Sequence, residues 1–126
     1  MHAMAERLGA KAELRATPVR DGEVEFELVP AEPTAATVTV SVDLTDPDGE
    51  LWVTVAGEGE TGDLLWLRNV VDAAVAGNVT LLEGRGRRRL EIALGPDDVR
   101  STTTYGRGFV PLPWRRHARI TRFAAY

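Results

Sequence analysis

Alternating apolar and polar positions dominate the first half of the chain. Residues 23–29 place apolar side chains and glutamates on opposite faces, and residues 36–44 repeat the pattern with five apolar side chains on one face. A half-buried strand has this period of two. An Asp-Pro-Asp-Gly turn at residues 46–49 then precedes a third alternating run at 50–56. The pattern predicts strands that fold back on one another as antiparallel neighbours.

The segment before these strands allows two interpretations. Residues 11–17 alternate small or apolar side chains with polar ones, and an Arg-Asp-Gly turn follows at residues 20–22. An alanine-rich helix over residues 4–15 is the alternative, because alanine has the highest helix propensity. We predict a strand over 11–17.

A change of period marks a single helix. From Asp63 to Ala76 the apolar residues recur at spacings of three and four, Asp63 can cap the first turn, and Gly77 follows the last turn. After the helix, three more alternating segments are separated by turns that contain glycine or proline, as in a second meander. These segments are residues 79–83, 87–94 and 99–104.

Together these patterns predict an α+β fold, an antiparallel sheet of six to seven strands in two meanders with the helix Asp63–Ala76 packed on one face. We expect residues 1–126 to form a single domain with a flexible N-terminus at 1–10 and an irregular basic C-terminal tail at 105–126. A helix is about 10 Å wide, whereas six or seven strands span roughly 25 to 30 Å. The sheet must therefore curl toward a half-barrel, be covered by the tail, or be covered by a second copy, and we favour the homodimer.

Charge is distributed unevenly along the chain. The net charge of −4 combines 5 basic and 16 acidic residues in 1–84 with 10 basic and 3 acidic residues in 85–126. Such halves attract each other or attract different partners. Lys11 is the one lysine beside 14 arginines, a bias that favours a bacterial source with a GC-rich genome.

Cysteine is absent, and no run of 18 apolar residues occurs. The sequence therefore offers neither disulfides nor a thiolate nucleophile, and we expect no membrane span. A chain without cysteine suits a reducing compartment, so we expect a cytoplasmic protein.

Three glycines between a predicted strand and the predicted helix form a G-x-G-x-x-G pattern. Gly57, Gly59 and Gly62 resemble the dinucleotide-binding fingerprint. The resemblance implies that these glycines bind a pyrophosphate at the helix N-terminus and that Glu83, at the end of the next strand, binds a ribose hydroxyl. Neighbouring carboxylates would repel a pyrophosphate, so we favour a flexible acidic loop that caps the helix, and we expect no cofactor.

Basic and aromatic residues form a second group of candidates. Arginines interleaved with aromatic rings are typical of surfaces that bind phosphates and bases, but the acidic pI of about 5.2 favours pairing with the carboxylates of the first half. Trp52 lies on the polar face of its predicted strand, where an aromatic ring is suited to contact a partner. The candidate partner-binding residues are Trp52, Arg87, Arg89, Trp114, Arg115, Arg116, His117 and Arg119.

Groups suited to catalysis are few. The chain has two histidines, His2 and His117, and two serines, Ser41 and Ser101. We identify no catalytic residue and no metal site in the sequence. This inventory favours a non-catalytic domain without deciding the question.

The function that we expect is that of a protein-binding or regulatory domain, with immunity-type proteins as an analogy at the level of the fold. Its partner would be a protein, with a second copy of the chain as one option, and we do not expect a nucleic acid. Two alternatives remain, a nucleotide-binding protein that uses the Gly57–Gly62 loop and a nucleic-acid binder that uses the C-terminal arginines.

Overall fold

Nine strands and two helices form within the part of the chain that the computed structural model describes, which comprises residues 9–46, 50–84, 86–105 and 118–126. The elements in chain order are η1 (Gly9–Lys11), β1 (Ala12–Arg20), β2 (Glu23–Pro30), β3 (Val38–Asp43), β4 (Leu51–Val55), β5 (Glu58–Gly62), α2 (Leu64–Ala76), β6 (Val79–Gly84), β7 (Arg87–Gly95), β8 (Asp98–Tyr105) and β9 (Arg119–Arg122).

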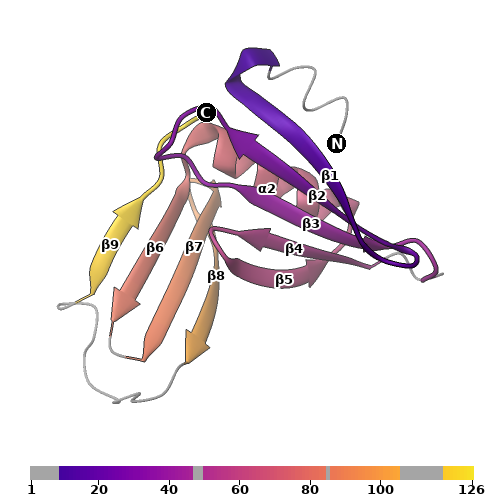
Figure 1. Ribbon diagram of the computed structural model, residues 1–126. Coiled ribbons are helices and arrows are strands. Elements are labelled where there is room, and N and C mark those ends of the chain that lie inside the picture. The colour runs from indigo at the N-terminus through magenta and orange to yellow at the C-terminus, as the bar shows by residue number, and fades with distance from the viewer. Residues whose placement is uncertain (1–8, 47–49, 85, 106–117) are drawn as a thin grey trace.

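The strands form two antiparallel sheets that diverge from each other (Figure 1). The first sheet has five strands in the order β1-β2-β3-β4-β5, and the second has four in the order β8-β7-β6-β9. The predicted α+β class, the two meanders and the single α-helix are confirmed. The strand predicted over residues 11–17 is also confirmed, except that Lys11 ends η1 and β1 begins at Ala12.

Two details of the prediction were wrong. The strands form two sheets, of five and four strands, instead of one sheet of six to seven strands. The segment interpreted as a flexible loop over residues 57–62 is mostly the strand β5, paired with β4. The C-terminal tail is a separate case: residues 119–122 form the short strand β9, and residues 106–117 lie outside the described part of the chain.

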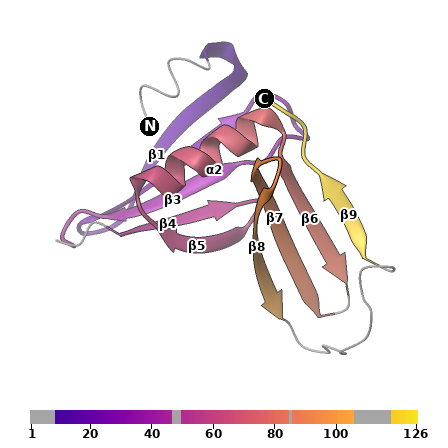
Figure 2. The ribbon, with the colours of Figure 1, turned by 180° about the vertical axis from the view of Figure 1, so that it is seen from behind.

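The sequence predicts more apolar strand surface than one helix can cover, and the division into two sheets explains how this surface is buried. Helix α2 crosses one face of the five-stranded sheet, behind it in Figure 1 and in front of it in Figure 2. The inner face of the second meander supplies further apolar side chains to the same core, among them Leu81, Leu90 and Ile92. Because both sheets and the helix share one cluster, each hides its apolar face without a second helix.

Both ends of α2 are capped as the sequence predicts. The Asp63 side chain accepts a hydrogen bond of 2.8 Å from the backbone N–H of Trp66. At the other end Gly77 has φ of 77°, and the N–H groups of Gly77 and Asn78 donate to the carbonyls of Ala74 and Ala73. These two bonds form a Schellman motif, which requires the left-handed conformation that glycine adopts most readily.

The last residues of the chain connect the two sheets. After β9, Ala124 forms an isolated parallel bridge with Ala35, ahead of β3. The Tyr126 backbone N–H donates to the carbonyl of Val75 at 3.1 Å, and its hydroxyl donates to the carbonyl of Ala36 at 2.7 Å. Residues 123–126, which we call the C-terminal clasp, therefore hold the second sheet against the helix and the first sheet.

Because Tyr126 is partly buried, the free energy of unfolding should fall at alkaline pH. Burial raises the pKa of Tyr126 from 10.0 to about 12. The unfolded chain loses this proton at a lower pH than the folded chain, so the contribution is present below pH 10 and is lost as the pH rises through 12. Because the ring is partly solvated, we expect a loss of no more than about 1 kcal/mol.

Tyr126→Phe tests this dependence. At neutral pH the variant should lose about 1 kcal/mol of unfolding free energy, because the carbonyl of Ala36 loses its hydroxyl donor. Urea unfolding at pH 8, 10 and 11.5 should then show a smaller alkaline loss in the variant than in the wild type. Parallel pH profiles for the two proteins would contradict the assignment to Tyr126.

Candidate binding surface

The face of the five-stranded sheet that α2 leaves uncovered is polar and rich in carboxylates. Side chains alternate along each strand, so the residues that pair with one another across the sheet share a face. We call this surface the acidic face. Its members, besides Val29 and Arg20, are Glu13, Arg15, Thr17, Glu23, Glu25, Glu27, Thr39, Ser41, Asp43, Trp52, Thr54 and Thr61.

Carboxylates outnumber cations on the acidic face. Its two arginine partnerships are local, Arg15 with Glu13 at 3.1 Å and, at the β1–β2 turn, Arg20 with Glu23. Three glutamates follow one another along β2 at every second position, as the sequence pattern predicts for a solvated strand face. The surface therefore carries a net negative charge that would attract a basic ligand.

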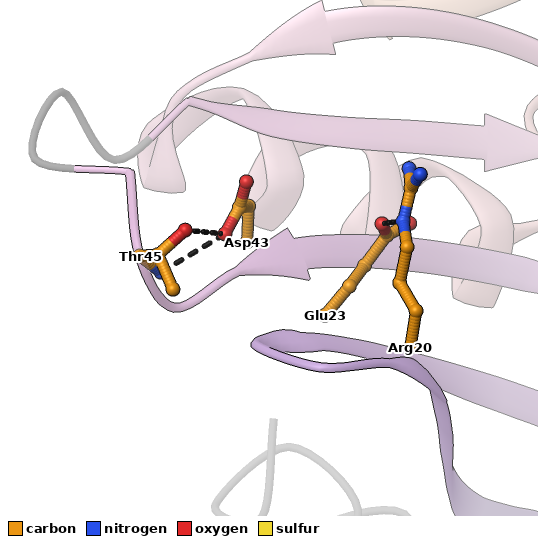
Figure 3. A network of polar contacts seen from close by, with 4 residues as sticks. All are labelled: Arg20, Glu23, Asp43 and Thr45. Atoms are coloured by element: carbon orange, nitrogen blue, oxygen red, sulfur yellow. Dashed lines mark hydrogen bonds and ion pairs between the residues drawn. The ribbon is translucent and has the colours of Figure 1, made fainter.

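One end of this face is hollowed, and Figure 3 shows four residues at that end. The hollow has a volume of about 280 Å³, and the residues that line it include Trp52, Ser41, Thr61 and four acidic residues. The four carboxylates belong to Glu23, Asp43, Asp46 and Glu50.

The carboxylate of Asp43 is fixed by its neighbour in the chain. The Thr45 hydroxyl donates to Asp43 Oδ1 at 2.6 Å, and the Thr45 backbone N–H donates to the same atom at 2.9 Å (Figure 3). The hydroxyl, then the backbone N–H, and more weakly the charge of Arg20, lower the pKa of Asp43. Asp43 therefore keeps its charge at any pH near neutrality.

The ring of Trp52 lies over a glycine, which explains one member of the glycine pattern. Trp52 is 50% exposed, and a Cβ atom added to Gly59 would lie 2.6 Å from its ring. Similarly, a Cβ atom added to Gly62 would lie 2.1 Å from the ring of Trp66. Both glycines thus provide space for an indole on the neighbouring element.

The other residues of the glycine pattern do not gather into a site. Gly57 lies in the turn between β4 and β5 with φ of 85°. Glu83 lies on β6, in the other sheet, with its carboxylate 3.7 Å from the Nε of Arg88. The structure therefore accounts for these residues by turn geometry, aromatic packing and ion pairing.

The predicted basic candidates lie apart from Trp52. Arg87 and Arg89 project from β7 on the face opposite Leu90 and Ile92, and Arg89 pairs with Glu91 at 3.2 Å. Arg119 lies on β9, opposite Glu83 in the register. Trp114, Arg115, Arg116 and His117 lie outside the described residues. The described candidates are thus divided between the two sheets.

An ion pair between the sheets is not among the features predicted from the sequence. Arg88 Nη1 lies 3.1 Å from Glu58 Oε1, and the Glu58 residue is only 7% exposed. Nearby, the hydroxyl of Thr102 on β8 donates to Glu60 on β5 at 3.2 Å. One signal was present in the sequence, because Arg88 shares its strand parity with the buried Leu90 and so points toward the core.

Within the described ranges, no three histidine, cysteine, aspartate or glutamate side chains lie close enough together to hold a metal ion. No helix among the described residues is both long and apolar enough to span a membrane. Comparison with protein-family models, with curated proteins and with solved structures finds no match to this chain.

Proposed function

We propose that the chain is a cytoplasmic, non-catalytic protein-binding domain whose acidic face binds a basic segment of a protein partner. The observation that carries this proposal is an uncovered sheet face with an excess of carboxylates and a half-exposed tryptophan at one end. Tryptophan is enriched at the energetic centres of interfaces, and charges around it steer and select the partner.

The charge of this face determines the kind of partner. Phosphate-bearing ligands would meet the repulsion of Glu25, Glu27 and Asp43, whereas arginines and lysines would be attracted. The basic surface of a second copy is one possible source of these cations, since the second sheet carries Arg87, Arg89 and Arg122. A heterologous contact of that kind would join copies head to tail.

A defined peptide tests the acidic face. We expect a twelve-residue peptide of alternating arginine and serine to shift the backbone amide resonances of β2, β3 and β4 in an NMR titration, with an affinity that falls as salt rises. Glu25→Gln with Glu27→Gln should weaken binding about threefold to tenfold, because each exposed pair contributes about 0.2–1 kcal/mol.

The control for this experiment changes the net charge equally but elsewhere. Asp72 lies exposed on α2 and Asp97 lies exposed in the β7–β8 turn. Asp72→Asn with Asp97→Asn should leave the affinity within about twofold of the wild type, since distant exposed charges are screened. Equal weakening by both double variants, or a peptide that shifts resonances of the second sheet instead, would disprove the proposed surface.

A further inference from the structure

We propose that the hollow beside Trp52 is an anchor site for the guanidinium group of an arginine in the partner. The inference rests on the proposed function and makes it specific, because it names the side chain that the acidic face recognises and the place where it binds. It depends on the ring of Trp52, on the carboxylates around it and on the protein's own Arg20.

The ring supplies a plate against which a planar cation can stack. Half of the Trp52 surface is exposed, and Gly59 beneath the ring leaves no side chain that would lift it from the sheet. Tryptophan attracts cations over its face more strongly than the other aromatic residues do. A guanidinium group can stack on the ring with its apolar face and still present N–H groups at its edge.

The hollow also supplies acceptors for those N–H groups. Glu23, Asp43, Asp46 and Glu50 line it together with Ser41 and Thr61. Carboxylates accept hydrogen bonds from guanidinium in pairs, a geometry that the ammonium group of lysine does not reproduce. The arrangement therefore favours arginine over lysine, and it disfavours every anionic ligand.

Arg20 shows that a guanidinium group can pair with a carboxylate of the hollow. Its Nε contacts Glu23 Oε2 (Figure 3), and both residues belong to the lining of the hollow. Arg20 is exposed at the end of β1, so an incoming arginine could share or replace its position. Arg20 would then compete with the partner for the hollow.

The test uses the full chain and three peptides that differ in one side chain. They are the alternating arginine and serine dodecamer, its lysine counterpart, and a counterpart with neutral citrulline. The indole N–H resonance of Trp52, assigned by its absence in Trp52→Phe, should shift with the arginine peptide, shift less with lysine and not move with citrulline.

Variants in the hollow give the expected change in affinity. Trp52→Ala should weaken the arginine peptide about tenfold, and Trp52→Phe should retain part of the affinity. Gly59→Ala keeps the ring but displaces it, and should also weaken binding. Ile120→Ala is the matched control, since Ile120 is 52% exposed on the other sheet, and it should change nothing.

Two arginine variants separate the hollow from the general charge of the face. Arg20→Gln removes the competing guanidinium and should strengthen binding of the arginine peptide more than Arg15→Gln, which removes an arginine of the same face that does not line the hollow. Equal strengthening by both variants would show that only net charge matters, and the anchor site would be overturned.

The remaining outcomes distinguish this inference from the proposed function. If Glu25→Gln with Glu27→Gln weakens binding but Trp52→Ala does not, the acidic face is supported as the binding surface and the anchor site is disproved. If the arginine peptide does not bind at all, both the proposed function and the anchor site are disproved. If a neutral glucose hexasaccharide shifts the Trp52 resonance and the arginine peptide does not, the hollow is a carbohydrate site and the proposal is wrong.

Discussion

Gly77→Ala should lower the free energy of unfolding by about 3 kcal/mol, because it combines about 1–2 kcal/mol of left-handed strain with about 1–3 kcal/mol of overpacking. Gly77 has φ of 77°, and a Cβ atom there would lie 2.8 Å from the backbone nitrogen of Ala125. A backbone atom cannot rotate away as a flexible side chain can. The C-terminal clasp would therefore have to move away from the end of α2.

Gly57→Ala is the matched control for this effect. Gly57 has φ of 85°, similar to that of Gly77, but nothing lies within 4 Å of its added Cβ atom. It should therefore show only the left-handed strain of about 1 kcal/mol. Urea unfolding of the two variants separates strain from collision, and equal losses would show that the clasp does not press against Gly77.

A double variant shows which contacts account for the stability lost in Gly77→Ala. If the collision displaces the clasp, removing residues 124–126 as well should cost little more than the first substitution, because the same contacts cannot be lost twice. Additive losses would place the effect within α2 itself.

Local patterns determined most of the fold in advance. The alternation in β2, β3 and β4 and the caps of α2 depend on residues near one another in the chain, so the sequence reveals them directly. The division into two sheets depends on whether β6 pairs with β5 or begins a new sheet. Alternation predicts which side chains share a face, but it does not specify the neighbouring strand.

The same distinction explains what the sequence revealed of the candidate site. Trp52 could be identified because its parity opposes that of the buried Leu51 and Val53. The roles of Gly59 and Gly62 could not, because each makes room for an indole from another element. Gly59 and Gly62 match a phosphate-binding pattern in the sequence, but in the folded protein each provides space for a tryptophan ring.

Arg88→Met should lower the free energy of unfolding by about 3 kcal/mol, since breaking a buried ion pair on one side removes the cation that faces the remaining buried charge. The substitution deprives the carboxylate of Glu58 of the guanidinium at 3.1 Å, and Glu58 is almost wholly buried between the sheets. The size of the loss measures how firmly this pair joins the two sheets.

The reverse substitution should be milder, and this asymmetry is the sharper test. In Glu58→Gln the side chain of Arg88 remains partly exposed and can still approach Glu83, now 3.7 Å away, so we expect a loss of about 1 kcal/mol. The double variant should recover most of the loss of Arg88→Met, because it leaves no buried charge behind.

Arg89→Met is the matched control, because Arg89 is the next residue of β7, faces the opposite side and pairs with Glu91 at a partly exposed position. It should cost less than about 1 kcal/mol. If Arg88→Met and Arg89→Met prove equally mild in chemical unfolding, the pair contributes no more than a surface ion pair. The apolar core that both sheets share with α2 would then be sufficient to hold them together.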